Sequence, residues 1–224
     1  MTIITALEVG IGTTLGNGHF WGYWPGHMWG KIILKMFLIP VKVEGRENLE
    51  KDQSYVFVAN HQGSFDIFLI YGHLGRNFKW MMKQQLRKVP FLGYACAKSH
   101  QIFVDKRGPS KIRKTYEDAR EILKEGYSVT VFPEGARSFT GHMAHFRKGA
   151  FALADELQLP VVPLTINGSF DVFNRNAKSV SLGTVTLTIH KPITAEERQG
   201  KQTKVMMQEV YDIINGGLDE KYKS

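Results

Sequence analysis

The sequence has few of the residues that build disulfide frameworks and metal centres. Its 224 residues include one cysteine, Cys96, which excludes a disulfide within the chain and a cysteine-based metal site. Cys96 lies in a short apolar, helix-like run, where we expect a buried packing role. The histidines other than His61 show no clustered ligand spacing, and His142 and His145 alone, three residues apart, do not predict a metal site.

Long hydrophobic runs are also missing. Residues 1–15 are mildly apolar, with Glu8 as the only charge. This stretch is shorter than the ~20 apolar residues that a spanning helix needs, and it lacks the basic start of a signal peptide. The sequence therefore predicts neither a membrane-spanning helix nor a cleaved secretory signal.

Aromatic residues are instead concentrated just after this stretch. Residues 19–29 hold three tryptophans, Trp21, Trp24 and Trp29, and Lys31 and Lys35 follow four residues apart. Tryptophan side chains favour the headgroup level of a bilayer, and lysines extend from a helix toward anionic headgroups. We therefore predict that residues 1–38 associate with a membrane by entering one leaflet, the alternative being a hydrophobic helix packed on the core.

Acidic side chains are scarce relative to basic ones. The chain has 29 Lys and Arg against 21 Asp and Glu, a net charge of +8, which implies an anionic partner. No nucleic-acid-binding motif or repeated aromatic-basic pattern is visible. An anionic phospholipid surface and phosphorylated substrates explain the same charge, so the sequence predicts no nucleic-acid partner.

The most informative stretch runs from a buried-strand pattern at residues 56–59, through a polar cluster, into an apolar helix pattern. The cluster contains His61 and Asp66, and ligands of open α/β sheets bind at the carboxyl ends of strands. With Ser64 as the helix N-cap, Asp66 lies in the first turn beside His61. This pair is a catalytic triad without its nucleophile, which indicates that a substrate hydroxyl attacks. The alternative is that Asp66 only caps a helix.

Two further strand patterns also end in charged residues. One covers residues 102–104 and is followed by Asp105, Lys106 and Arg107. The other covers residues 129–132 and is followed by a turn with Glu134 and Arg137. A surface turn with a salt bridge explains Glu134 and Arg137 alone, but three strands that end in titratable groups indicate a shared site.

These blocks together resemble the four motifs of the glycerolipid acyltransferases, and in particular the bacterial 1-acyl-glycerol-3-phosphate (lysophosphatidic acid) acyltransferases. The resemblance covers about residues 41–192, and a fifth element, which begins at Lys83, is similar to the lysine-containing segment after the catalytic helix. The motifs stand in the family's order as Asn60-His61-x4-Asp66, Ile102-Phe103-Val104-Asp105-Lys106-Arg107, Phe132-Pro133-Glu134-Gly135-Ala136-Arg137-Ser138 and Val161-Val162-Pro163-Leu164, and the fifth element is Lys83-x2-Leu86-x3-Pro90-x2-Gly93.

The chain departs from the family pattern in two places. Ala136 stands where the third motif usually has threonine. In the second motif Lys106 stands where arginine is expected, with Arg107 next. Which of these two cations faces the substrate is left open by the sequence.

The resemblance implies a role for each matched residue. His61 is the general base that deprotonates the acceptor hydroxyl, and Asp66 orients its ring. Glu134 belongs to acceptor binding, through a glycerol hydroxyl or by positioning Arg137. Backbone N–H groups after Pro163 are one candidate for the oxyanion donors. The residues expected to bind substrate are Lys83, Lys106, Arg107, Glu134, Gly135 and Arg137.

The resemblance also implies an activity. An acyl chain passes from acyl-CoA or acyl carrier protein to the free hydroxyl of 1-acyl-glycerol 3-phosphate (lysophosphatidic acid) and gives phosphatidic acid. No metal or organic cofactor is required, because the thioester is already activated. The expected location is the cytoplasmic face of the bacterial inner membrane, on its anionic surface. The alternatives are another acceptor, glycerol 3-phosphate or a lyso-aminolipid, and a non-catalytic membrane-binding module; a hydrolase is disfavoured because no Gly-x-Ser-x-Gly segment is present.

The expected fold is an α/β fold similar to that of the glycerol-3-phosphate acyltransferases, with a single mixed sheet flanked by helices. Residues 1–38 form the membrane-associating segment and residues 39–224 the acyltransferase domain. Within this domain the sequence predicts helices over residues 110–124 and 195–214 and strands over residues 161–166 and 185–189.

Overall fold

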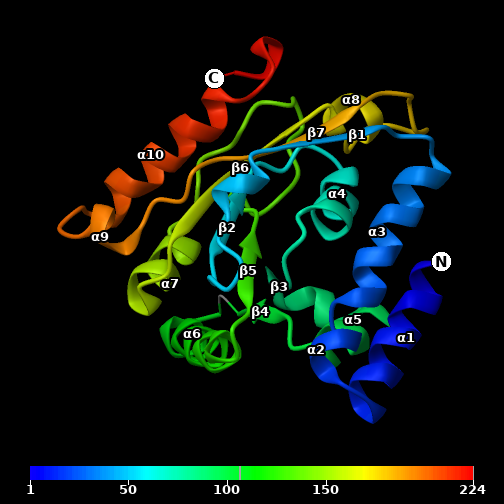
Figure 1. Cartoon of the computed structure of the whole chain (residues 1–224), viewed down its shortest axis with the longest axis horizontal. Helices are drawn as coiled ribbons and strands as arrows, with labels where there is room; N and C mark the ends of the chain where they lie inside the picture. The colour runs from blue at the N-terminus through cyan, green and yellow to red at the C-terminus, as the bar shows by residue number, and fades with distance from the viewer. Residues whose placement is uncertain (106, 224) are drawn as a thin grey trace.

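A computed structural model describes residues 1–105 and 107–223. One seven-stranded sheet, in the order β1-β7-β6-β2-β5-β3-β4, forms its centre (Figure 1). Neighbouring strands run parallel except for the antiparallel pair β6 and β7, which confirms the predicted mixed sheet. The strands are β1 (Val41–Glu44), β2 (Val56–Ala59), β3 (Phe78–Lys83), β4 (Ile102–Val104), β5 (Ser128–Val131), β6 (Val161–Asn167) and β7 (Val185–Ile189).

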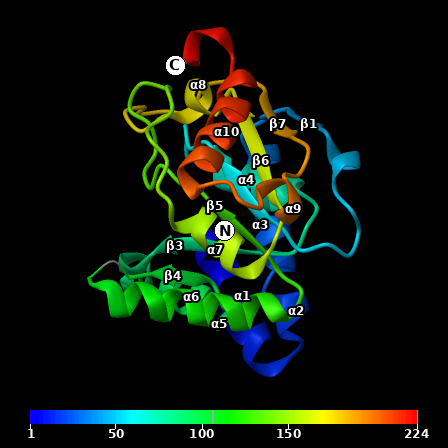
Figure 2. The same cartoon turned by 90° about the vertical axis from the view of Figure 1, so that its left-hand side faces the viewer.

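Helices cover both faces of this sheet (Figures 1 and 2). The α-helices are α1 (Thr2–Leu15), α2 (Gly18–Trp21), α3 (Trp24–Met36), α4 (Phe65–His73), α5 (Leu92–Lys98), α6 (Pro109–Lys124), α7 (Gly149–Leu157), α8 (Ser169–Phe173), α9 (Ala195–Arg198) and α10 (Thr203–Gly216). Short 3₁₀ turns are η1 (Arg46–Asn48), η2 (Gln84–Lys88) and η3 (Glu220–Tyr222).

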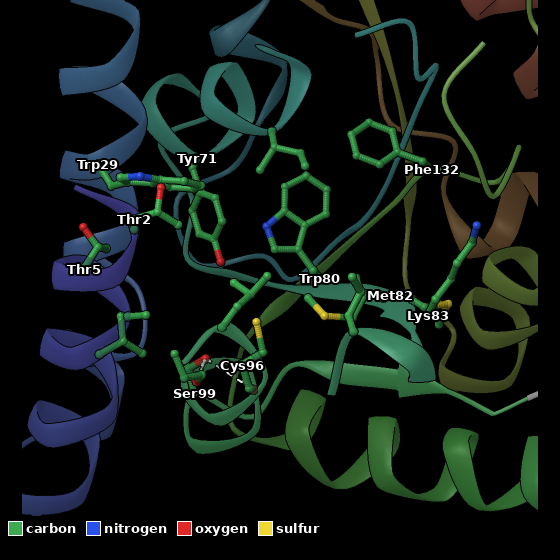
Figure 3. A pocket seen from close by; sticks show the side chains of 18 of the residues that line it. Thr2, Thr5, Trp29, Tyr71, Trp80, Met82, Lys83, Cys96, Ser99 and Phe132 are labelled. Carbon is green, nitrogen blue, oxygen red and sulfur yellow. Dashed lines mark hydrogen bonds between the residues drawn. The ribbon is translucent and has the colours of Figure 1, made fainter. Parts of the chain in front are cut away.

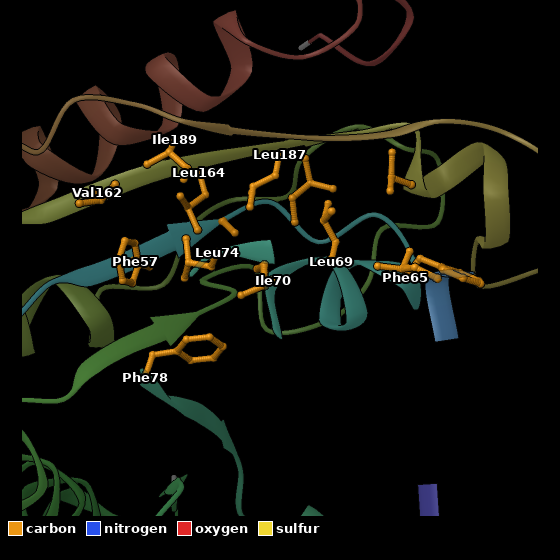
Figure 4. Packing of buried hydrophobic residues seen from close by; sticks show 14 of the residues in the cluster. Phe57, Phe65, Leu69, Ile70, Leu74, Phe78, Val162, Leu164, Leu187 and Ile189 are labelled. Carbon is orange, nitrogen blue, oxygen red and sulfur yellow. The ribbon is translucent and has the colours of Figure 1, made fainter. Parts of the chain in front are cut away.

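The core lies in two layers, one on each face of the sheet. On one face, α3 and α4 pack against inward side chains of β2, β6 and β7. Leu69 and Ile70 of α4 contribute to this layer, as do Phe57 of β2 and Leu164 of β6 (Figure 4). On the other face, α7 and α10 pack against β2 and β6, and α6 packs against β4 and β5. The sheet is therefore shielded on both sides, as parallel strands require.

The central strands explain where the polar residues gather. All four residues of β2 and of β5 are buried. Both faces of these strands are covered by helices, so charged side chains are confined to the segments that follow the strands. Because β2, β3, β4 and β5 are parallel neighbours, their carboxyl ends lie at one edge of the sheet. That edge is where the chain places the first, second and third motifs.

One element differs from the prediction. The helix predicted over residues 195–214 is divided into α9 and α10. Gly200, between them, has φ +80, a left-handed conformation that a continuous right-handed helix does not contain. The predicted strand at 185–189 is confirmed, and the helix predicted to begin at residue 110 begins at Pro109.

The N-terminal helices pack on the body of the protein and still expose apolar side chains. Helix α3 packs along α4, and α1 packs along α5. Trp24 is exposed, Trp21 is half-buried, and Trp29 packs edge-to-face on Phe68 at 4.7 Å between ring centroids. Within the part of the chain that the structure describes, no helix is long and apolar enough to cross a membrane.

Candidate active site

His61 and Asp66 lie side by side in the loop and first helical turn that follow β2. His61 Nδ1 is 2.7 Å from Asp66 Oδ2. The same oxygen accepts the backbone N–H groups of Gln62 at 2.8 Å and Gly63 at 2.9 Å. Asp66 is fully buried, so these three donors hold a charge that water does not reach. The predicted pairing of base and orienting carboxylate is present in this geometry.

The ring of His61 is fixed from a second direction by Phe132. The two rings stack with centroids 3.9 Å apart and an interplanar angle of 9°, and Trp80 stacks behind Phe132 at 5.2 Å. Since Asp66 accepts the Nδ1 proton, Nε2 is the unprotonated nitrogen of the neutral ring. The imidazole is therefore arranged to accept a proton at Nε2. Sequence reasoning missed this stack, because nothing in the spacing of Phe132 and His61 shows that their strands are neighbours.

Glu134 supports the histidine loop from behind. Its Oε1 accepts the backbone N–H of His61 at 2.7 Å, and its Oε2 accepts that of Ala144 at 2.9 Å. The side chain is only 5% exposed, and burial raises the pKa of this carboxyl to about 7. Both oxygens are thus occupied by backbone donors. These contacts differ from the expected ones, a glycerol hydroxyl or Arg137.

The turn after β5 brings Arg137 to the same place. Gly135 has φ +78, in the left-handed region that favours glycine, which lets the chain turn sharply between Glu134 and Arg137. Arg137 Nη1 donates to the Ser64 hydroxyl at the start of α4. Ser64 is the predicted N-cap of α4, but its side chain makes no capping hydrogen bond. This hydroxyl accepts from the arginine instead.

A mostly apolar cavity of about 500 Å³ opens beside this cluster (Figure 3). His61, Lys83 and Arg137 line one part of it, and Figure 3 shows Trp29, Tyr71, Trp80 and Phe132 around it. Helix α1 forms a further wall with Thr2, Thr5, Ala6 and Val9. We call this the catalytic cavity. Its lining suits a hydrocarbon chain, with a titratable pair and cations at one side.

Cys96 lines the catalytic cavity as well. Burial raises the pKa of its thiol to about 11, so the thiol stays protonated near neutral pH and is a poor nucleophile. Its side chain is half-buried and not fully buried as predicted, because it faces the catalytic cavity.

The remaining predicted cations are distributed unequally. Lys83, at the end of β3, lines the catalytic cavity. Arg107 is held by Asp105, with Nη2 2.6 Å from Oδ2 and Nε 2.9 Å from Oδ1, and it does not line that cavity. Lys106 lies outside the described residues. Gly135 lines the catalytic cavity beside Arg137.

The structure adds Arg175, a cation that the motifs did not include. It follows α8 and lines the catalytic cavity with His61 and Arg137. Its guanidinium lies over the ring of Phe139, 4.1 Å from the centroid, and it forms no ion pair with a described acidic residue. No local sequence pattern marks Arg175; only the path of the chain after β6 brings it to this edge.

The fourth motif has a structural position. Val161 to Leu164 lie in β6, fully buried between β2 and β7. Leu164 is paired in the sheet with Ala59 and Ile189, so the backbone after Pro163 is engaged in the sheet ladder. The suggestion that it supplies oxyanion donors is not supported by this placement. Among the described residues, no group of three or more His, Cys, Asp or Glu side chains is placed to hold a metal ion.

The acyltransferase family model matches residues 40–167. This range contains His61, Asp66, Glu134 and Arg137. The chain belongs to the acyltransferase family. The family assignment covers the sheet edge and the site described above, and it bears out the resemblance found in the sequence.

Several relatives of this acyltransferase carry informative names. It is 31% identical over 194 residues to Arabidopsis thaliana "1-acyl-sn-glycerol-3-phosphate acyltransferase LPAT1, chloroplastic", with 86% of this chain and 52% of the relative covered. It is 33% identical over 191 residues to the Saccharomyces cerevisiae 1-acyl-sn-glycerol-3-phosphate acyltransferase, with 82% and 61% covered. The chain spans about half the length of several curated relatives that it matches.

A solved structure has the same fold. The crystal structure of the 1-acyl-sn-glycerophosphate (LPA) acyltransferase PlsC from Thermotoga maritima matches with a TM-score of 0.78 and 28% sequence identity. The match covers 93% of this chain and 85% of that chain.

Proposed function

We propose that this acyltransferase moves an acyl chain from a thioester, acyl-CoA or acyl carrier protein, to the free hydroxyl of 1-acyl-glycerol 3-phosphate and so makes phosphatidic acid. The observation that carries the proposal is the His61–Asp66 pair beside an apolar cavity with cations in its wall. The relatives named for this reaction support it. We further propose that the reaction takes place at the anionic cytoplasmic face of a bacterial inner membrane.

The geometry supports a direct transfer. His61 Nε2 accepts the proton of the acceptor hydroxyl while the hydroxyl oxygen attacks the thioester carbonyl. Asp66 stabilises the imidazolium that forms. When the tetrahedral intermediate collapses, the C–S bond breaks, and the imidazolium returns the proton to the departing thiolate. The substrate hydroxyl is the nucleophile, so no acyl-enzyme forms in this scheme.

Arg137, Lys83 and Arg175 are the cations suited to the acceptor's phosphate, because all three line the catalytic cavity. A guanidinium binds phosphate through parallel hydrogen bonds. A phosphorylated acceptor is therefore favoured over a lyso-aminolipid. A protein that only binds membranes would not need a buried carboxylate, Asp66, that holds the Nδ1 side of the His61 ring and leaves Nε2 toward the cavity.

A thiol-release assay on the purified protein tests the proposal. We expect release from acyl-CoA to depend on lysophosphatidic acid, with smaller rates for glycerol 3-phosphate and lysophosphatidylethanolamine. His61→Ala should lower kcat by about 10²–10⁴-fold, whereas the control His145→Ala, an exposed histidine, should not. If His61→Ala retains more than about a tenth of the wild-type rate, the general-base role is wrong.

The acceptor phosphate gives a second prediction. Arg137→Ala should raise KM for lysophosphatidic acid by roughly 10- to 150-fold, the range expected for a lost hydrogen bond to a charged group. KM for the acyl donor should change much less. Arg113→Ala is the matched control because its side chain is 83% exposed and already paired with Glu117, and it does not line the catalytic cavity. Equal effects of Arg137→Ala on both KM values would indicate a structural role.

A further inference from the structure

A second hollow, of about 1080 Å³, adjoins the catalytic cavity. Its walls are the end of β3 with η2, the end of β4 with the first half of α6, and the start of α7. The two hollows share wall residues at the ends of β3 and β5, namely Met81, Met82, Lys83, Phe132 and Gly135. They are therefore adjoining spaces along one edge of the sheet, and we call this one the basic hollow.

The lining of the basic hollow is strongly positive. Its one described acidic residue, Asp105, is already bound by Arg107. The other cations in the wall make no ion pair with any described acidic residue; they are Lys83, Arg87, Lys88, Arg147 and Lys148. Like charges gathered without counter-charges raise the free energy of the folded protein unless an anion binds there.

The start of α7 adds to this field. Lys148, Gly149 and Ala150 line the hollow, and the first turn of α7 contains no acidic side chain. The unpaired N–H groups and the positive end of a helix favour an anion. The opposite wall carries the exposed side chains of Arg87 and Lys88, so cations lie on both sides of the space.

The floor of the hollow is apolar and partly aromatic. Ile112 and Tyr116 of α6 and Val131 of β5 line it, and burial raises the pKa of the Tyr116 hydroxyl, which keeps this side chain neutral. A ring system that stacks on an aromatic or aliphatic surface fits such a floor. Cations on two sides and a neutral floor suit a ligand with several phosphates and a planar base.

We propose that the basic hollow binds the 3′-phosphoadenosine diphosphate part of acyl-coenzyme A. This inference rests on the proposed function and names its donor. The pantetheine arm passes the wall that the two hollows share, which brings the thioester to His61 and the acyl chain into the catalytic cavity. A carrier protein presents the same pantetheine arm without the nucleotide, so in this assignment coenzyme A is the donor whose nucleotide fills the basic hollow.

Binding without catalysis tests the site directly. Isothermal titration of the whole protein with adenosine 3′,5′-bisphosphate and with free coenzyme A should show binding that weakens as salt rises. The double variant Lys88→Glu with Lys148→Glu should weaken both by about tenfold or more. The control, Lys191→Glu with Lys204→Glu, reverses two exposed lysines outside the hollow and should bind as wild type does. Absence of binding by the wild type, or equal losses in both double variants, overturns the proposal.

Transfer assays separate this inference from the proposed function. The double variant should lower kcat/KM for acyl-CoA by about tenfold relative to that for the same acyl chain on pantetheine, which lacks the nucleotide. A matching loss with both donors, or a loss with acyl carrier protein and not with acyl-CoA, overturns the nucleotide site. Failure of the wild type to transfer from any donor overturns the proposed function, and the titration above still reports on the hollow.

Discussion

The three hydrogen bonds that Asp66 Oδ2 accepts come from the ring of His61 and from the backbone of Gln62 and Gly63. The carboxylate therefore ties the imidazole ring of His61 to its own loop. Glu134 ties the same loop to the segment that contains Ala144, because one oxygen binds the backbone of His61 and the other that of Ala144. The position of His61 thus depends on two buried carboxylates, one on each side of the loop.

Replacing Glu134 by glutamine should destabilise the protein. Glutamine has one acceptor oxygen, so its amide NH₂ would face one of the two backbone N–H groups. An unsatisfied buried donor costs about 1–3 kcal/mol. Urea unfolding of wild type and Glu134→Gln measures the difference. An unchanged unfolding free energy would show that these two hydrogen bonds do not stabilise the loop.

The same variant should change how stability depends on pH. The pKa of Glu134 rises from an ordinary value of 4.5 to about 7 on folding. Between these values the folded state binds more protons than the unfolded state, so this group's contribution to stability is full below about pH 4.5 and declines as pH rises through 7. The decline is roughly 3 kcal/mol at most. The stability difference between wild type and Glu134→Gln should therefore be larger at pH 5 than at pH 8; equal differences would contradict the raised pKa.

At the scale of elements, α3 and α4 approach closely where two glycines face each other. A Cβ added to Gly30 would lie 2.6 Å from the Phe68 carbonyl oxygen and 2.8 Å from the Gly72 nitrogen. These are backbone atoms, which do not move aside as a side chain does. The glycines therefore set the distance between α3 and the helix that carries Asp66.

Gly30→Ala should push α3 away from α4 and destabilise the protein. Overpacking of this kind costs about 1–3 kcal/mol. Gly18→Ala is the control from the same N-terminal region, because a Cβ there has no atom within 4 Å. The difference in melting temperature between the two variants measures the effect. A Gly30→Ala protein that melts with or above the wild type would show that the helices tolerate a wider spacing.

The elements that the sequence predicted well are those with local signals. The continuous apolar run before His61 and the charged ends at Asp105 and Glu134 mark strand ends without knowledge of the fold. The break at Gly200 was missed, because α9 consists of residues with high helix propensity and a glycine alone does not end a helix. The positions of Trp29 and Arg175 depend on packing between distant segments, which no local pattern encodes.

At the scale of the whole molecule, exposed apolar side chains gather on the N-terminal helices and near α5. The exposed set includes Ile3, Ile4, Leu7, Ile11, Leu15, Phe20, Trp24, Met28, Phe91 and Tyr94. Lys31 and Lys35 are exposed on α3 as well. A collection of apolar and basic side chains supports the proposal that residues 1–38 meet a lipid surface. Trp24, rather than Trp29, is the tryptophan best placed for it.

Polar replacements on this surface test membrane binding without deleting core residues. Ile4 and Ile11 are 58% and 57% exposed on α1, and each contributes roughly 1.5–3 kcal/mol when fully buried in an apolar medium. Ile4→Asn with Ile11→Asn should lower co-sedimentation with anionic liposomes by at least about tenfold. Val205→Asn is the control, since Val205 is 53% exposed on the distant helix α10. Equal sedimentation of the double variant and wild type would place the contact elsewhere.

Helix α1 forms part of the wall of the catalytic cavity, so the residues that shape the apolar space belong to a different element from the residues that transfer the proton. Thr2, Thr5, Ala6 and Val9 line the cavity, whereas His61 and its supports belong to the sheet edge. Larger or smaller side chains on α1 would shorten or lengthen the apolar space and leave the proton-transfer geometry intact. If the acyl chain lies there as proposed, selection among fatty acids of different length can diverge between descendants of this enzyme through substitutions in one helix, while the chemistry is inherited unchanged.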